Sequence, residues 1–450
     1  ESTELCRKEE GLNLKLWKMV FPSRNLGCFR MKKEYLIFLM LLSISYLYFQ
    51  NILALDWDFM VYILNSEYFV GKNWFFEIER APLASFLMAP FSLFSRNLAR
   101  FCYPALVFFL YLLSIYYLCK KFKLDFWLFL LFALNPFVLR YGLTCGTELL
   151  SLSLLIFSCS FFSKPWLAGV FLGLGILARY QVAIFFPVFL GFQAANSKSL
   201  RQILYFSLGT VIPILPWLLF NFYLTGHLFY SFFDSYARNI AFLKYYEHSL
   251  FSLILPFNLY LPLFFLGVFY LARKREYFKV LFGLIWLICG FLIYFQAKLW
   301  VERYLFFSTF PIALFSYFGF LSRKEKIGKI LEPIIFSGLV AAIIFLFLTL
   351  KPVSYSQFEE FPVNKTCLMM SDRFVIFNWL GYKAVPPFLS LGKEDFERKL
   401  ERYSENYTLI LFDHNLIIPS ERCLKETPRF LSFSEALERD FNLSSNPCIY

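Results

Sequence analysis

The sequence predicts a polytopic all-α bundle of membrane-spanning helices, followed by a small α/β domain in the C-terminal part. Three observations support this fold class. Hydrophobic residues make up 59% of the 450 residues, whereas soluble domains contain about 45–50% apolar residues. The apolar residues form successive stretches, many of them long enough to cross a bilayer. The net charge of +12 comes from short basic clusters between these stretches, a pattern typical of the cytoplasmic loops of membrane proteins.

The charges and the cysteines argue against two other classes of protein. The basic clusters alternate with apolar stretches, so binding to nucleic acid is not expected. The ten cysteines include no Cys-x2-Cys pair, which argues against a structural zinc site. Five of them lie in or beside apolar segments and are predicted to be packing residues: Cys102, Cys119, Cys145, Cys159 and Cys289.

The predicted membrane domain covers residues 31–350. Residues 1–30 form a polar and basic N-terminal extension, and Met31-Lys32-Lys33 before an apolar run has the pattern of a natural start. Eleven spans are predicted after it: 35–53, 102–119, 125–142, 147–162, 166–178, 181–193, 203–222, 251–271, 280–297, 304–320 and 333–350. The fifth and sixth spans are short, and a hairpin that enters and leaves on one side is the alternative.

A shorter apolar segment, Ala81–Phe94, is predicted to be a juxtamembrane helix in the membrane interface, with a span as the alternative. If this segment does not span, the basic loops at Lys120, Arg273 and Arg323 fall on the same side as the N-terminus. The distribution of Lys and Arg therefore predicts a multi-pass cell-membrane protein with a cytoplasmic N-terminus. The loop of residues 54–101 and the C-terminal domain would lie outside.

The C-terminal part, residues 351–450, is predicted to form a small extracytoplasmic α/β domain, because strand-like and helix-like segments alternate along it. The predicted strands are residues 365–370 and 407–412, and the predicted helices are residues 372–380 and 393–404. Three glycosylation sequons in this part agree with an exported tail: Asn364, Asn406 and Asn442.

Two carboxylates directly follow the first predicted span. Asp56 and Asp58 would lie just outside the bilayer, where charged groups need partners or a function. If the segment is helical, Asp58 and Tyr62 share one face. Both aspartates are therefore candidates for a general base on the outer side. The alternative is that they only solvate an interfacial loop.

Several other charges stand where an anionic headgroup can reach them. Glu79 and Arg80 precede a Pro-capped apolar helix, whose N-terminus favours a phosphate; a helix-capping charge pair is the alternative. Glu148 opens a span on the outer side, where the helix dipole alone also favours an acid. Arg179 interrupts two apolar segments and needs a partner or an anionic ligand, unless it snorkels to the surface.

Two further candidates lie in later outer loops. Glu302-Arg303-Tyr304 opens a span on the outer side and offers another cation for a phosphate. His248 follows Glu247, and such a pair can bind a divalent metal ion. The alternative is that His248 is an ordinary surface or packing residue.

The pattern Asp58-x3-Tyr62, followed by Glu79-Arg80-Ala81-Pro82-Leu83, resembles the first outer loop of the GT-C glycosyltransferases. The likeness is greatest to the bacterial aminoarabinose transferases of lipid A and to the protein O-mannosyltransferases. Further echoes follow in order: Asn135-Pro136, Thr147-Glu148-Leu149, Gly175 to Arg179-Tyr180, Pro216-Trp217 to Asn221, Thr225-Gly226 and Glu302-Arg303-Tyr304. Arg80 stands where that superfamily often has lysine, and Ala81 replaces a proline. The absence of a Trp-Trp-Asp-Tyr-Gly motif argues against an oligosaccharyltransferase.

The resemblance implies an inverting transfer of one sugar from a polyprenyl (dolichyl or undecaprenyl) phosphate donor to an acceptor lipid, glycan or protein on the outer face. Asp58 would be the base, with Asp56 and Glu148 as further carboxylates at the reaction centre. The residues implied to bind the lipid phosphate are Arg80, Arg179, Arg303 and Tyr62. Glu79 and His248 would hold a divalent metal ion, either Mg²⁺, Mn²⁺ or Zn²⁺.

Two alternatives remain open at the level of the sequence. The first is a polytopic lipid transporter, flippase or scaffold, for which internal inverted repeats and charges near the membrane midplane are expected. The sequence shows no such repeat, and its charges gather at the outer edge of the spans. The second is an enzyme that transfers phospholipid headgroups, which needs the same phosphate-binding cations.

Overall fold

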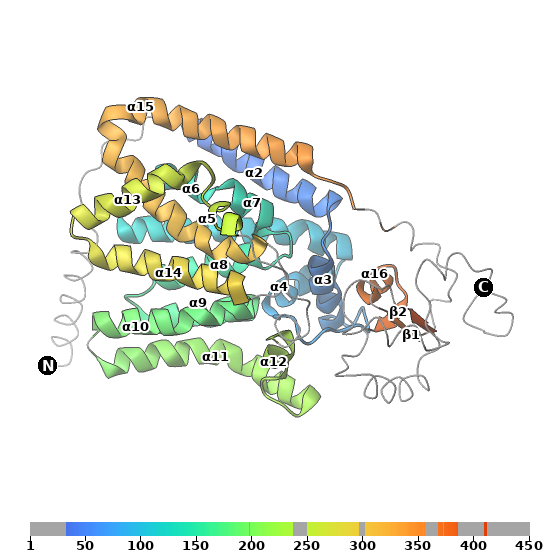
Figure 1. Cartoon of the computed structure of the whole chain (residues 1–450). Helices are drawn as coiled ribbons and strands as arrows, with labels where there is room; N and C mark the ends of the chain where they lie inside the picture. Colours follow the sequence, from blue (N-terminus) through green and yellow to red (C-terminus); the bar gives the residue numbers. More distant parts are fainter. Residues whose placement is uncertain are drawn as a thin grey trace.

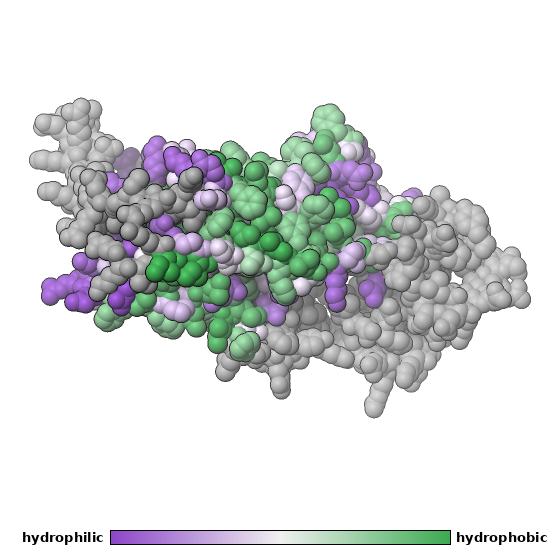
Figure 2. Space-filling view, turned by 90° about the horizontal axis from the view of Figure 1, so that it is seen from above, coloured by the Kyte–Doolittle hydropathy of each residue, from purple (hydrophilic) through white to green (hydrophobic). Residues whose placement is uncertain are grey.

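The computed structural model describes residues 33–197, 199–236, 250–296, 302–353, 355, 368–371, 373–385 and 409–411. Long apolar helices lie side by side in one bundle, and three short strands lie beyond one end of it (Figure 1). Figure 2 shows apolar side chains across the middle of the molecule and hydrophilic side chains on either side of them. The described chain is thus mainly helical, as the composition predicts.

The helices of the bundle are α2 (Lys33–Leu53), α3 (Trp57–Phe69), α4 (Leu83–Ser92), α5 (Arg96–Phe122), α6 (Phe126–Ala133), α7 (Pro136–Gly142), α8 (Glu148–Ser160), α9 (Pro165–Ala178), α10 (Phe185–Ser197), α11 (Leu200–Thr225), α12 (Tyr230–Tyr236), α13 (Leu261–Arg273), α14 (Tyr277–Gln296) and α15 (Thr309–Thr349). Four 3-10 helices join them: η1 (Tyr180–Ile184), η3 (Leu250–Ile254), η4 (Asn258–Tyr260) and η5 (Glu302–Ser308).

Six described helical segments are long and apolar enough to cross a membrane: Lys33–Leu53, Arg96–Phe122, Leu200–Thr225, Tyr277–Gln296, Glu302–Lys324 and Ile330–Thr349. Five shorter apolar helices accompany them: Leu83–Ser92, Glu148–Ser160, Pro165–Ala178, Tyr180–Ala195 and Asn258–Arg273. The chain therefore has the helices of a membrane protein. The total of eleven spans and their orientation stay predictions.

The predicted span 125–142 is wrong as a single helix, because the chain breaks between α6 and α7. The first piece ends at Ala133, and Asn135 caps the second, where its side-chain oxygen accepts a hydrogen bond from the Phe137 amide at 2.8 Å. Pro136 follows as the first residue of α7, a position that needs no amide donor. The Asn-Pro pair therefore starts a new helix inside a uniformly apolar stretch.

One other predicted span also differs from the observed helices. Residues 251–260 of the predicted span 251–271 form short 3-10 turns, because Asn258 adopts a left-handed φ of 46° that a continuous α-helix does not allow. The predicted spans 304–320 and 333–350 agree with the candidate spans Glu302–Lys324 and Ile330–Thr349. Helix α15 runs through both of them, and its ribbon doubles back on itself in Figure 1.

Glycines bring two pairs of helices into close contact. A Cβ added to Gly169 of α9 would press on the backbone oxygen of Phe206 in α11. A Cβ added to Gly267 of α13 would press in the same way on the backbone of α15 at Phe315. Since membrane helices associate through close backbone packing, these glycines fix the neighbours of α9 and α13.

The C-terminal elements comprise strands β1 (Leu368–Ser371), β2 (Lys383–Val385) and β3 (Leu409–Leu411), with helix α16 (Phe374–Trp379) between the first two. The strands pair in parallel in the order β2-β1-β3. Strands β1 and β3 overlap the predicted strands at 365–370 and 407–412, and α16 falls within the predicted helix 372–380, whereas β2 was not predicted. The predicted helix 393–404 and the three sequons lie outside the described residues, and the extent of an α/β domain stays a prediction.

Candidate carboxylate–arginine site

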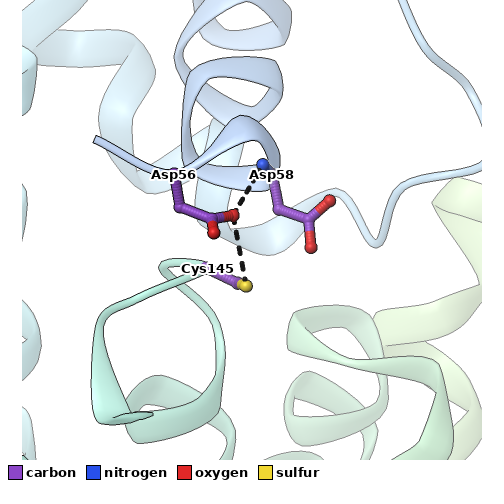
Figure 3. Close-up of side chains that lie close together, drawn as sticks. All are labelled: Asp56, Asp58 and Cys145. Carbon is purple, nitrogen blue, oxygen red and sulfur yellow. Dashed lines mark hydrogen bonds between the residues drawn. The ribbon is translucent and has the colours of Figure 1, made fainter. Parts of the chain in front are cut away.

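The site is built on the start of α3, which lies in the loop that follows α2. Asp56 caps this helix, with its side-chain oxygen accepting a hydrogen bond from the Asp58 amide at 2.9 Å. Capping orders the first turn, so Asp58 takes a fixed position at the positive end of the α3 dipole. Figure 3 shows both carboxylates at this turn, above a loop that carries Cys145.

Two arginines from distant parts of the chain hold the Asp58 carboxylate. Arg80 Nη1 lies 2.8 Å from Asp58 Oδ1, and Arg303 Nη2 lies 3.0 Å from Asp58 Oδ2. Arg80 also donates from Nε to Glu77 at 3.2 Å. The structure therefore brings together three predicted site residues. Glu77 was not among the predicted residues, although its position three residues before Arg80 is a signal that was open to sequence reasoning.

Cys145 belongs to this cluster, and its prediction as a packing residue did not include these polar contacts. The thiol is buried and donates a hydrogen bond to Asp56 Oδ1 at 3.4 Å, and Arg303 donates a hydrogen bond to its sulfur. Ligand atoms of Asp56, Asp58 and Cys145 all lie within 4.8 Å of one another. The cysteine stands in a short loop just before α8, outside the apolar helices, and this position was the available signal.

The surroundings shift the pKa values of Asp56 and Asp58 in opposite directions. Burial raises the pKa of Asp56 to about 6, the negative charge of Asp58 adds to this rise, and Arg303 opposes it. Burial also works to raise the pKa of Asp58, but the guanidinium groups of Arg80 and Arg303 outweigh it and hold that pKa below its usual range. Burial raises the pKa of the Cys145 thiol well above its usual value.

A second ion pair lies next to the first. Arg179 Nη1 is 2.6 Å from Glu148 Oε1 and 3.2 Å from the Thr147 hydroxyl. The guanidinium group of Arg179 also lies over the ring of Tyr304 at 5.4 Å. Because Tyr304 directly follows Arg303 in the chain, the Arg179–Glu148 pair lies next to the Arg303–Asp58 pair. Glu148 and Arg179 were each predicted as site residues, and the structure shows that they bind each other.

The backbone of Arg80 is held by a buried hydrogen-bond network. Tyr180 donates to the Arg80 carbonyl at 3.2 Å and lies 3.0 Å from the Ser231 hydroxyl. Trp217 donates to Tyr180 at 2.9 Å. This network ties the segment that carries Arg80 to η1, α11 and α12, and so fixes where the Arg80 guanidinium group can reach.

Two of the remaining predicted residues, Tyr62 and Glu79, lie close enough to Arg80 to interact with its charge. Tyr62 is buried one turn after Asp58, and burial raises the pKa of its phenol, while the charge of Arg80 opposes the rise. Glu79 is buried but does not belong to the metal-capable group of the described residues. His248 lies outside the described residues, so the predicted Glu79–His248 metal pair stays a prediction.

The described metal-capable group is Asp56, Asp58 and Cys145. Carboxylate oxygen and thiolate sulfur are ligands that Zn²⁺ accepts, whereas Mg²⁺ prefers oxygen alone. Arg303 contacts both Asp58 and Cys145. A metal ion at these atoms therefore requires the Arg303 guanidinium group to move aside.

No family model matches the chain, and neither a curated protein nor a solved structure matches it. The class of protein is accordingly defined by the fold and the site alone. The described chain is a bundle of apolar helices that carries a partly buried cluster of carboxylates and guanidinium groups at one end.

Proposed function

We propose that this protein is an integral membrane glycosyltransferase that transfers a sugar from a polyprenyl-phosphate donor to an acceptor on the outer face of the membrane. The observation that carries the proposal is Asp58 held between Arg80 and Arg303 at the end of a bundle of apolar helices. A lipid-phosphate sugar needs a carboxylate beside the anomeric carbon, cations beside its phosphate and an apolar surface for its tail.

In the proposed reaction, an acceptor hydroxyl attacks the anomeric carbon as the bond between that carbon and the phosphate oxygen breaks. Asp58 takes the proton of the hydroxyl, and the polyprenyl phosphate leaves with the electron pair. Arg80 and Arg303 stabilise the negative charge that grows on the phosphate. As these guanidinium groups turn toward the phosphate, one carboxylate oxygen of Asp58 becomes free to accept the proton.

The grouping of Asp56, Asp58 and Cys145 supports a divalent cation at the same site, because ligand atoms of these three residues lie within 4.8 Å of one another. A divalent ion held by these residues would bind the phosphate oxygens and stabilise the negative charge that grows on them.

The proposal is tested with purified protein and synthetic polyprenyl-phosphate sugars. Asp58→Asn keeps the size of the side chain and removes the charge that would accept the proton. We expect sugar release or transfer to fall at least about a hundredfold, as is typical when a general base is lost. Full activity of Asp58→Asn would overturn the assignment of Asp58.

Asp125→Asn is the matched control, because Asp125 also sits at a helix start, where its side chain accepts a hydrogen bond from the Leu128 amide at 3.0 Å. It should leave transfer unchanged. Addition of a chelator tests the divalent ion separately. If no lipid-linked sugar binds at all, the glycosyltransferase proposal fails, and transported lipids and phospholipid headgroups become the substrates to examine.

A further inference from the structure

The C-terminal segment returns to the start of the candidate site. The Val353 amide donates a hydrogen bond to the Leu53 carbonyl at 2.8 Å, and the Tyr355 hydroxyl donates to the Leu55 carbonyl at 2.9 Å. Leu55 directly precedes Asp56. These contacts attach the link between α2 and α3 to residues that lie 300 positions later in the chain.

Helix α16 also packs on α3 through aromatic rings. The Phe374 ring lies 5.4 Å from the Trp57 ring in an edge-on arrangement, and 5.5 Å from the Phe75 ring. Trp57 stands between Asp56 and Asp58 in the sequence. Phe374 is buried, so its removal would open a gap against the Trp57 ring.

Arg96 joins the last part of α3 to the end of α16. Its guanidinium group makes two hydrogen bonds of 2.7 Å to the carboxylate of Glu67, near the end of α3. It also donates to the Trp379 carbonyl at 2.5 Å and lies 4.5 Å from the centre of the Trp379 ring. Arg96 is the first residue of α5, where the helix dipole disfavours a positive charge. The partners of Arg96 offset this disadvantage and join α3, α5 and α16.

We propose that Val353, Tyr355 and helix α16 form a positioning element of the candidate site. These residues contact the start, the side and the end of α3, and so fix the positions of Asp56 and Asp58 relative to Arg80, Arg303 and Cys145. The proposal goes beyond the proposed glycosyl transfer, because it concerns the geometry of the site whatever ligand the site takes. It can therefore be tested without a substrate.

Cys145 reports the position of α3. Its thiol contacts Asp56, and the following residue, Gly146, packs directly under the Phe59 ring of α3. A shift of α3 therefore uncovers Cys145 to a maleimide. Cys159 is the internal control, because it is equally buried but lies near the other end of α8.

The experiment compares the labelling rates of Cys145 and Cys159 in the full-length protein in detergent micelles, with N-ethylmaleimide as the probe and peptide mass spectrometry as the readout. Phe374→Ala should raise the rate at Cys145 about tenfold or more. Tyr355→Phe removes one hydrogen bond and should raise it about threefold. Cys159 should keep its rate in both variants.

Tyr48→Phe is the matched control for the hydroxyl, because Tyr48 donates an equivalent hydrogen bond to the Phe101 carbonyl at 2.7 Å, away from α3. It should leave Cys145 unchanged. Unchanged labelling of Cys145 in both Phe374→Ala and Tyr355→Phe would overturn the proposal. An equal rise at Cys145 and Cys159 would also overturn it, because it would show general loosening of the bundle. A failure to detect sugar transfer would bear only on the proposed function.

Discussion

Replacement of Glu148 by glutamine is expected to destabilise the bundle, because it removes the charge that compensates Arg179. The Glu148 side chain is 0% exposed and the Arg179 side chain is 10% exposed, so little water is present to solvate the unpaired guanidinium group. Breaking a buried pair from one side typically costs about 3–5 kcal/mol. Glu148→Gln keeps the shape of the side chain, so the change isolates the charge.

The local contacts place the expected loss near the lower end of that range. In Glu148→Gln, the Thr147 hydroxyl still accepts a hydrogen bond from Arg179 at 3.2 Å, and the Tyr304 ring still lies 5.4 Å from the guanidinium group. A cation over a ring contributes about 0.5–2 kcal/mol. We therefore expect the free energy of unfolding to fall by about 3 kcal/mol.

A double-mutant cycle measures the interaction. Glu148→Gln, Arg179→Met and the double variant are unfolded by denaturant in the same detergent, and the free energy of unfolding is compared with that of the unmodified protein. The double variant should be about 2 kcal/mol more stable than the sum of the single losses predicts, because it leaves no uncompensated charge. Losses that add to within about 0.5 kcal/mol would refute the reasoning.

The remaining predictions concern the loop before α8 and the cations of the site. Gly146→Ala should lower the free energy of unfolding by about 2 kcal/mol or more, because φ is 84° and the new Cβ would lie 2.7 Å from the Phe59 ring. Gly71 has a similar φ of 73° but open space around it, so Gly71→Ala should lower the free energy of unfolding by less in the same denaturant titration. Arg303→Lys keeps a charge but loses the two-armed contact, so transfer in the lipid-linked sugar assay should fall about tenfold or more. Cys145→Ser should weaken binding of Zn²⁺ far more than binding of Mg²⁺ in equilibrium dialysis, since it replaces a soft sulfur ligand by oxygen; equal affinities would contradict the inclusion of the thiol.

The long apolar helices could be predicted from hydropathy because a spanning helix must be both apolar and long enough to satisfy its own backbone in lipid. The observed ends of α2, α11 and α14 lie within three residues of the predicted ends. Hydropathy could not show the break at Asn135-Pro136, because both of its flanks are apolar. It also could not show that η3 and η4 replace an α-helix, since a left-handed residue leaves no trace in hydropathy.

The charged members of the site could be predicted because ionised groups near a membrane rarely lie there without a partner. Asp58, Arg80 and Arg303 were found in this way, whereas the thiol of Cys145 was missed, because an uncharged, small and apolar residue type gives no such signal. The contact between Arg96 and Trp379 could not be predicted either. It joins residues 283 positions apart, and only the tertiary packing of α16 brings them together.

The doubled-back helix α15 gives the protein an order of assembly. Its last part lies beside α2, with the Tyr46 and Phe347 rings 5.3 Å apart (Figure 1). During biosynthesis, α2 therefore emerges from the ribosome long before this neighbour exists. The Asp56 segment must wait in the nascent chain until residues near 350 have been inserted. A chaperone or a temporary partner that shields α2 in this interval would act on the assembly of the site. A protein interrupted before α15 would carry the carboxylates of the candidate site without this support.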